Sequence, residues 1–247
     1  MTPAIQGIVY LLIGLFSGVF TGMFGIGGGS VRTPLLNIFG LPLRSAFGIN
    51  LFVIPFSSSI GAISHRKNID WSLAKPVVAG GIFGSIVGAL LVGLFSNLVL
   101  AFLFFALAVL TSAGIFLDRI WPRLSQKLRM GPAGVGFTTF LLNLVTGMRG
   151  GSGGSLLPPL LKVLTGDIRR AIATSLLATI FTASAGTIVY WGRGDIGWVP
   201  ALCTMIGSIA GTRAGSMVSI KTKSVWLEAG LSVTVILFAL ATVYKAL

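Results

Sequence analysis

The sequence predicts an all-α polytopic membrane protein built from two internal repeats. Hydrophobic residues make up 54% of its 247 positions, charged residues make up only 9%, and the mean hydropathy is +0.97. A soluble domain is built with about half apolar content at most, so this chain carries more apolar surface than a water-soluble core uses. The charges are also segregated, because the stretch 76–117 contains none. Long uncharged apolar stretches are typical of helices that cross a bilayer.

The repeat is carried by a glycine-rich sequence that occurs twice. Residues 22–36 read GMFGIGGGSVRTPLL and residues 147–161 read GMRGGSGGSLLPPLL. The offset of 125 residues holds without a gap between 22–70 and 147–195, where 17 of 49 positions are identical. Matching Gly and Pro interruptions in the apolar segments of two halves are typical of a transporter's binding site.

The apolar segments predict eight long helices and two short ones. The long helices are expected at 5–24, 45–64, 73–95, 97–117, 132–148, 170–191, 198–218 and 225–246. The short ones are expected at 30–43 and 155–168, each directly after a glycine cluster. These segments divide into a first transmembrane repeat at 1–117, a basic cytoplasmic linker at 118–131 and a second transmembrane repeat at 132–247.

The short segments decide the topology. If they are re-entrant, each copy has four spans, the repeats are parallel (4+4), and Lys and Arg divide almost evenly between the two sides. If they cross, each copy has five spans, the repeats are inverted (5+5), and twelve Lys and Arg fall on one side against three on the other. The positive-inside rule favours the inverted arrangement, with both termini outside. About 14 helical residues reach only about 21 Å of a core about 30 Å thick, so the glycine breaks are expected to dip into the membrane.

Glycine also recurs every four residues in one long segment of each copy. These stripes are Gly80, Gly84 and Gly88 in the first copy, and Gly207, Gly211 and Gly215 in the second. Such a stripe lets a neighbouring helix backbone approach closely, so we expect tight helix packing there.

The net charge of +13 is explained by orientation in the bilayer. The basic residues lie in short loops between apolar spans, without the basic face and interleaved aromatic residues that nucleic acid binding uses. We therefore expect a lipid bilayer and a small anion as partners and no nucleic acid, with the oligomeric state left open.

The glycine runs predict an anion site. Glycine permits positive φ, so several backbone N–H groups can point the same way. Ser30 and Ser155 are suited to cap the helices that follow, and Pro34 and Pro159 suit the first turn. In an inverted repeat the positive ends of two half-helices then face one another near the midplane, where they attract a negative charge. The alternative is a glycine-permitted kink that binds no ligand.

The charged residues favour the anion site. All five acidic residues lie in loops or at span ends, so no carboxylate is expected near the bilayer centre. Arg149 replaces Phe24 of the first copy beside the second glycine cluster, and a substrate anion is a natural partner for its fork of donors. Asn50 and Ser175 occupy equivalent positions and are suited either to bind a ligand or to pack between helices. The predicted substrate-binding residues are Gly27, Gly28, Gly29, Ser30, Arg32, Asn50, Arg149, Ser152, Gly153, Gly154, Ser155 and Ser175.

An enzymatic interpretation rests on one motif. Residues 150–154 fit G-x-S-x-G with Ser152 as a nucleophile, as in an intramembrane serine hydrolase. The first copy has Gly27 at the matching position, and the only histidine, His65, lies at a span end. We therefore expect no enzyme, no catalytic residue, no metal site and no cofactor.

At these residues the chain resembles the TauE/SafE family of sulfite exporters. The resemblance lies in the two glycine-rich sequences ending in PLL and PPLL, in RRAIATSL (169–176), and in the I-x-W sequences at Trp71 and Trp198. It implies a bacterial or archaeal permease of the cytoplasmic membrane for sulfur-containing anions such as sulfite or sulfonates. The first copy departs from the family pattern, since SAFGINLFVIP puts Asn50 where a small hydroxyl residue is expected.

Together these observations predict a secondary transporter that exports a small sulfur-containing anion bound at the two glycine breaks. The copies are expected to rock against each other to give alternating access. The alternatives are an anion channel without alternating states and, more remotely, the serine hydrolase.

Overall fold

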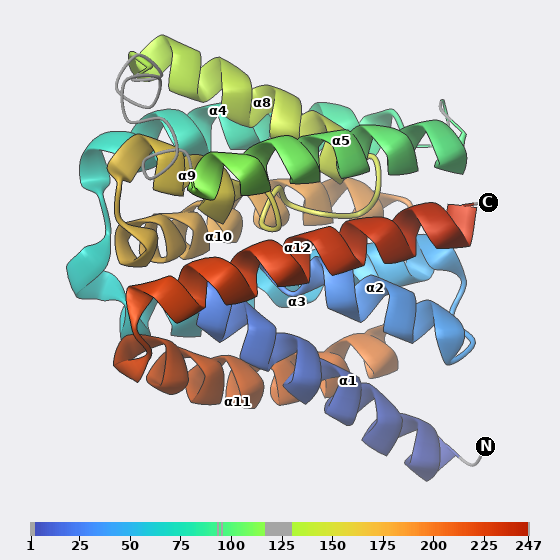
Figure 1. Cartoon of the computed structure of the whole chain (residues 1–247). Helices are drawn as coiled ribbons and strands as arrows, with labels where there is room; N and C mark the ends of the chain where they lie inside the picture. The colour runs from blue at the N-terminus through green and yellow to red at the C-terminus, as the bar shows by residue number, and fades with distance from the viewer. Residues whose placement is uncertain (1–2, 93, 95, 117–129, 247) are drawn as a thin grey trace.

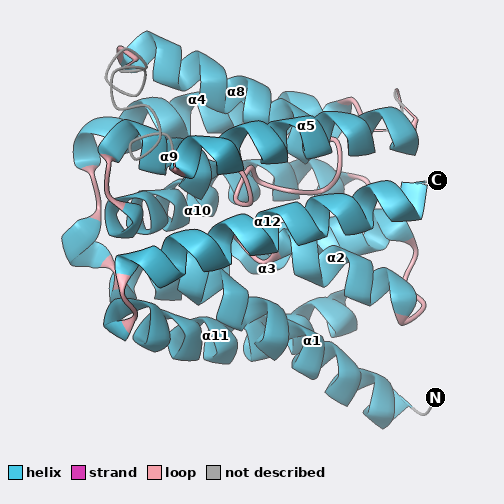
Figure 2. Ribbon diagram, in the orientation of Figure 1, coloured by secondary structure: helices cyan, strands magenta, loops and turns pink. Residues whose placement is uncertain are grey.

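The computed structural model describes residues 3–92, 94, 96–116 and 130–246, and within them all regular structure is helical (Figure 2). The first half contains α1 (Pro3–Phe24), α2 (Gly29–Ile38), α3 (Leu43–Ser64), the 3-10 turn η1 (Arg66–Asn68), α4 (Trp71–Leu90) and α5 (Asn97–Ile115). The second half contains α8 (Pro132–Gly147), α9 (Leu157–Thr165), α10 (Ile168–Gly192), α11 (Trp198–Lys221) and α12 (Ser224–Ala246). The predicted all-helical membrane class is therefore confirmed.

Five of these helices, α1, α3, α4, α10 and α12, are long and apolar enough to cross a membrane. Each segment predicted from the sequence corresponds to a helix at nearly the predicted place. The predicted linker at 118–131 falls almost entirely on residues 117–129, which lie outside the described residues. Its role, and the division of the chain into two repeats, stay predictions.

The two short helices are shorter than the apolar segments that contain them. Helix α2 has 10 residues and α9 has 9, so each is only about 14–15 Å long, half the thickness of a bilayer core. Gly40 (φ 97°) follows the end of α2, and Gly166 (φ 69°) caps the end of α9 in a left-handed conformation that glycine adopts without strain. Glycine thus lies at the C-terminal end of each half-helix.

Helices α1 and α11 pack closely along their length, and so do α4 and α8. The first helix of each half therefore lies on the fourth helix of the other half. The predicted glycine stripes lie in these two contacts: a Cβ on Gly211 would overlap the Leu15 carbonyl oxygen, and one on Gly84 would overlap that of Phe140. Helix α1 adds a stripe of its own at 14, 18 and 22, so the α1–α11 contact is glycine-lined on both sides.

Helices α3 and α10 pack against each other at the centre of the bundle. Helix α3 also packs against α11, and α10 packs against α4, so each central helix contacts one of the two glycine-striped helices. In the first half of each of these two helices, most residues are buried. This central pair is the scaffold against which the glycine breaks are held.

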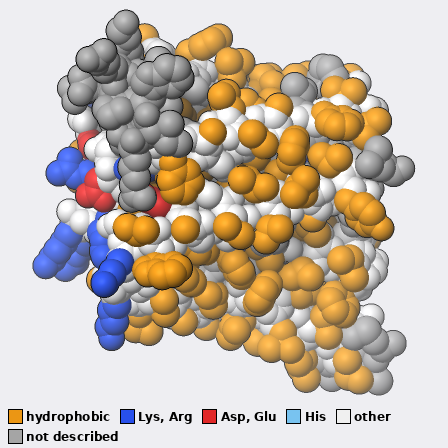
Figure 3. All heavy atoms as spheres, viewed as in Figure 1, with side chains coloured by type: hydrophobic (Ala, Val, Ile, Leu, Met, Phe, Trp, Pro, Cys, Tyr) orange, Lys and Arg blue, Asp and Glu red, His pale blue; other side chains and the backbone are white. Residues whose placement is uncertain are grey.

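The two ends of the bundle differ in charge. Both chain termini lie at one end in Figure 1, and the α3–α4, α9–α10 and α11–α12 connections lie at the other, which we call the basic end. These connections and the adjoining helix turns carry Arg66, Lys67, Arg169, Arg170, Lys221 and Lys223. The Lys and Arg side chains visible in Figure 3 gather at this end. This is the distribution that five spans per copy predict.

Two aspartates at the basic end cap the N-termini of helices. Asp70 accepts hydrogen bonds from the backbone N–H groups of Ser72 and Leu73 and so caps α4, and Asp167 accepts one from Arg169 N at 2.8 Å and caps α10. The Ser72 hydroxyl also donates to Asp70 Oδ1 at 2.6 Å. These hydrogen bonds hold the pKa of the Asp70 carboxyl below its usual value.

We predict that Gly18→Ala destabilises the bundle, because the added Cβ would overlap the Ser208 carbonyl oxygen of α11. Overpacking of this kind costs about 1–3 kcal/mol. Thermal unfolding of the detergent-solubilised protein measures the effect. Gly192→Ala is the matched control, since a Cβ there meets nothing within 4 Å. Equal unfolding midpoints for the two variants would contradict the close approach of α1 and α11.

Candidate binding site between two glycine breaks

Each break uses glycine where a side chain would be strained. In the first break Gly25 and Gly28 have φ of 70° and 69°, and in the second Gly150 and Gly153 have φ of 64° and 71°. These are equivalent positions in the two copies, 125 residues apart. The two breaks thus share two left-handed residues, a conformation that only glycine adopts freely. The first break has a third at Gly27 (φ 69°), where the second break has Ser152 without positive φ.

The second glycine of each pair accepts the first i→i+4 hydrogen bond of the half-helix region. The Gly28 carbonyl accepts from Arg32 N at 2.8 Å, and the Gly153 carbonyl accepts from Leu157 N at 2.9 Å. Gly28 is the N-cap of α2 and Leu156 that of α9, and neither helix has a side-chain cap. The expected capping by Ser30 and Ser155 is therefore wrong, because the N-cap of α2 lies two residues before Ser30 and that of α9 lies one residue after Ser155.

The uncapped starts leave backbone donors available. Within the described residues, the N–H groups of 29–30 and 153–155 donate no hydrogen bond. The first N–H groups of a helix carry the positive end of its dipole. Gly29 and Ser30 carry such groups of α2. The N–H groups of 153–155 instead precede α9, in which Leu157 N is bonded to the Gly153 carbonyl and the two prolines that follow have no N–H.

The two breaks touch one another. A Cβ on Gly154 would lie 2.7 Å from the Ile26 carbonyl oxygen, and a Cβ on Gly27 would lie 3.7 Å from Ser152 Oγ. Segments that are far apart in sequence thus form one local structure, and glycine is needed at Gly154 because of this approach.

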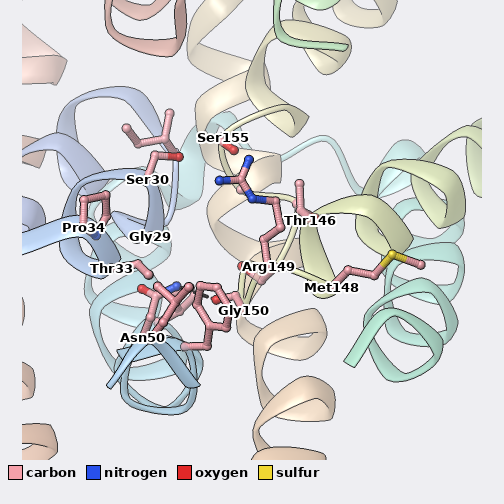
Figure 4. Close-up of a pocket in the computed structure, with 18 of the residues that line it drawn as sticks. Gly29, Ser30, Thr33, Pro34, Asn50, Thr146, Met148, Arg149, Gly150 and Ser155 are labelled. Atoms are coloured by element: carbon pink, nitrogen blue, oxygen red, sulfur yellow. Dashed lines mark hydrogen bonds between the residues drawn. The ribbon is translucent and has the colours of Figure 1, made fainter. Parts of the chain in front are cut away.

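A cavity of about 220 Å³ opens beside the joined breaks (Figure 4). Its polar lining comes from both breaks and the adjoining helices: Gly29, Ser30, Thr33, Asn50, Thr146, Arg149, Gly150, Gly151, Ser152, Gly153, Gly154 and Ser155. Its apolar lining consists of Ile26, Pro34, Leu43, Phe47, Ile54, Met148 and Ala241. Arg149 is the one charged side chain among these lining residues, and Figure 4 shows its guanidinium extending toward Ser30 and Ser155.

The predicted site residues divide into two groups. Eight line the cavity: Gly29, Ser30, Asn50, Arg149, Ser152, Gly153, Gly154 and Ser155. Four do not: Gly27, Gly28, Arg32 and Ser175. The sequence interpretation missed Thr33 and Phe47, although both lie one turn from predicted residues on α2 and α3 and helical spacing would have found them.

Arg32 lies behind the first break in a cage of neutral oxygens. Its side chain is fully buried, and it donates from Nε to Ser17 Oγ at 3.2 Å, from Nη1 to Asn50 Oδ1 at 2.9 Å and from Nη2 to Ser208 Oγ at 2.6 Å. These acceptors come from α1, α3 and α11. The guanidinium thus keeps its positive charge uncompensated by any of these partners. Its equivalent in the second copy is the buried, apolar Leu157.

Asn50 and Ser175 make equivalent contacts with the opposite break. Asn50 Nδ2 donates to the Gly150 carbonyl at 2.8 Å, and Ser175 Oγ donates to the Gly25 carbonyl at 2.9 Å. Each residue thus bonds the first glycine of the other copy's break. The central helices α3 and α10 satisfy carbonyls that the broken helices would otherwise leave unpaired in an apolar region.

Acidic groups lie away from the cavity. Glu228 lies near the start of α12 at a span end, as predicted, but it is buried and forms an ion pair with Lys162 of α9 at 3.5 Å. No Asp or Glu belongs to the cavity lining, and the described residues contain no group of three or more His, Cys, Asp and Glu suited to hold a metal ion.

Ser152 does not have the surroundings of a nucleophile. Its side chain is 2% exposed, and its Oγ has no hydrogen-bond partner among the described residues. The His65 ring contacts the Gly22 carbonyl at 3.3 Å at the end of α3. A serine nucleophile needs a base within hydrogen-bond reach.

A helical bundle with several membrane-spanning helices and a cavity between two broken helices belongs to the class of multi-pass membrane transporters. Comparison with known families agrees, since the family described as "Sulfite exporter TauE/SafE" matches residues 10–242. The chain belongs to this family.

Its relatives are described as membrane transporters. The chain is 28% identical over 202 residues to the "Probable membrane transporter protein MJ0441" of Methanocaldococcus jannaschii, which covers 76% of this chain and 74% of the relative. It is 26% identical over 219 residues to the "Probable membrane transporter protein YdhB" of Bacillus subtilis, covering 85% and 89%. No solved structure matches the chain.

Proposed function

We propose that the protein is a secondary transporter that exports a small sulfur-containing anion, such as sulfite or an organosulfonate, across the cytoplasmic membrane. The observation that carries this proposal is the cavity beside the breaks, with the unbonded N–H groups of 29–30 and 153–155 and with Arg149 as its one charged lining residue. An anion would accept hydrogen bonds from these N–H groups, and the guanidinium fork in the same lining suits an oxyanion. The sulfur chemistry rests on the family's description.

The apolar side of the cavity bears on the kind of anion. Phe47, Leu43 and Met148 add apolar surface to the cavity beside the donor-rich breaks. A substrate with an oxyanion head and a short carbon tail would fill both parts, whereas a bare inorganic ion would fill only the polar part. The cavity therefore favours an organosulfonate over sulfite.

Alternating access follows from an inverted 5+5 arrangement, which we propose for this chain. The exchange of partners between the halves supports it, since α1 packs on α11 as α8 packs on α4. The charge asymmetry between the two ends supports an orientation with the basic end in the cytoplasm and both termini outside. Rocking of one half against the other would then expose the site to each side in turn.

Among the described residues, the region on the basic side that corresponds to the cavity is packed. The cavity extends toward the termini end, because its lining includes Leu43 at the start of α3 and Ala241 near the end of α12 (Figure 1). The positions on α10 that correspond to the lining of α3 are fully packed: Ile168, Ile172, Ser175 and Thr179.

A single apolar cluster fills that equivalent region. It includes Leu156, Leu160, Ile168, Ile172 and Leu227, and the Lys162–Glu228 ion pair joins α9 to α12 beside it. This asymmetry supports a state with access from the termini end and closure at the basic end, one of the two states that alternating access needs and that an open channel lacks.

We predict that Arg149→Ala weakens anion binding by about 10- to 100-fold, the loss expected when a charged hydrogen-bond donor is removed. Binding to the purified protein and flux into liposomes should be measured with sulfite, taurine, sulfoacetate and chloride. Arg213→Ala is the control, because the exposed Arg213 bonds Ser64 away from the cavity. If none of these anions binds, or if Arg149→Ala binds as the unaltered protein does, the site is not an anion site.

We predict opposite accessibility for two equivalent positions. Single cysteines replace Phe47 and Ile172 in a Cys203→Ser background and are treated with a membrane-impermeant thiol reagent in vesicles of both orientations. Position 47 should react from the termini side, while the buried position 172 should react only from the basic side and more readily when Glu228→Gln breaks the ion pair. An anion channel would let the two sites react together, independently of the ion pair.

We predict that Ser152→Gly, which copies Gly27 of the first break, reduces anion flux no more than about tenfold, the worth of one hydrogen bond. Removal of a serine nucleophile costs on the order of 10⁶-fold in turnover. The same liposome assay distinguishes these outcomes, and an abolished activity in this variant would favour the hydrolase.

A further inference from the structure

Three differences between the two copies meet at one place. The second break carries Arg149 where the first has Phe24, α3 carries Asn50 where α10 has Ser175, and α2 carries Arg32 where α9 has Leu157. Arg32 bonds Asn50, and Asn50 bonds Gly150, the residue next to Arg149. The three departures from the repeat therefore form one continuous chain of contacts.

Arg32 fixes the orientation of the Asn50 side chain. A guanidinium can only donate hydrogen bonds, so the amide must turn its oxygen toward Arg32. The Nη1–Oδ1 distance is 2.9 Å, and Nη1 also lies 3.4 Å from the Asn50 carbonyl oxygen. The amide nitrogen is then left facing the second break, where it donates to the Gly150 carbonyl at 2.8 Å.

Helix α3 holds Gly150 from two directions. Asn50 bonds its carbonyl, and Phe47, one turn earlier, packs so closely that a Cβ on Gly150 would overlap the Phe47 side chain. The peptide that follows Arg149 is thus fixed to α3. Where α3 lies determines where the guanidinium of Arg149 enters the cavity.

The first break shows that holding a break glycine against a central helix does not itself require an arginine. Ser175 bonds the Gly25 carbonyl, and a Cβ on Gly25 would lie 2.9 Å from the Ile172 carbonyl oxygen, so α10 holds Gly25 as α3 holds Gly150. There the preceding residue is the apolar Phe24, and Leu157 stands where Arg32 stands in the first copy. Arg32 is therefore present only where the glycine that is held follows a charged residue, Arg149.

We propose that Arg32 and Asn50 are positioning residues for the transported anion: Arg32 orients Asn50, and Asn50 holds the Gly150 peptide so that Arg149 points into the cavity. Neither needs to touch the substrate: Arg32 does not line the cavity, and the Asn50 amide already binds Arg32 through Oδ1 and Gly150 through one of its N–H groups. This inference rests on the proposed anion site, and it assigns to Arg32 a role distinct from the ligand role that its position in the sequence suggests.

The first arm of the test needs no substrate. Arg149→Cys in a Cys203→Ser background is labelled with a small, negatively charged methanethiosulfonate reagent. Asn50→Asp keeps an acceptor for Arg32 but removes the donor to Gly150, so it should change the labelling rate at position 149 by about tenfold. Arg32→Leu, which copies Leu157, should act in the same direction. Ser175→Ala removes the equivalent hydrogen bond to Gly25 and should leave the labelling rate unchanged. Equal rates in all variants would overturn the proposal.

The second arm uses sulfoacetate binding in a double-mutant cycle. Asn50→Asp alone should weaken binding about tenfold, and in an Arg149→Lys background the same substitution should have a smaller effect. Fully multiplicative losses would show that Asn50 contacts the anion itself, and a lowered unfolding midpoint with unchanged affinity would show a structural role only; either result overturns the proposal. Absence of sulfoacetate binding in the unaltered protein counts against the proposed function and leaves the labelling arm to decide the positioning role.

Discussion

The backbone polar groups at the two helix breaks have to be satisfied inside an apolar bundle. Each break frees carbonyl and N–H groups that a continuous helix would pair, and the bilayer offers no water for them. The carbonyls are bonded by the central helices, Gly150 by Asn50 and Gly25 by Ser175. The backbone N–H groups of 29–30 and 153–155 donate no hydrogen bond among the described residues, so both breaks leave donors unpaired. These unpaired donors are the basis of the proposed anion site.

The glycine stripes make this arrangement possible. Helices α1 and α8 each lead into a break, and each lies on a glycine-lined helix of the other half, α11 and α4. Close backbone contact replaces side-chain packing there and fixes the point at which each broken helix ends. Ser208, which bonds Arg32, lies next to Gly207 in this contact. The same interface that positions α1 therefore also supplies part of the cage around the buried guanidinium.

Local patterns predicted most of the fold and part of the site. Apolar length predicted the helices, and four-residue glycine spacing predicted the α4 and α11 contacts, although the same spacing at 14, 18 and 22 of α1 was overlooked. The lining role of Arg149 follows from its place beside the glycines. The cage of Arg32 did not follow, because Ser208 lies 176 residues away in the sequence and only the tertiary packing brings it close. The predicted capping role of Ser30 was wrong because Gly28, with positive φ, is the N-cap and the helix begins before Ser30.

The differences between the copies matter physically if the two end states are related by exchange of the halves. Identical copies would give both states the same free energy and the same affinity for the anion, so the protein would bind equally well on either side. Arg149 belongs to one break only, and the Arg32 cage belongs to the other half. In the second end state, the break that carries Arg149 and the part of α3 that holds it would therefore contact different residues than in the first. The asymmetric residues are therefore the ones that can set different affinities on the two sides, which the bare repeat cannot do.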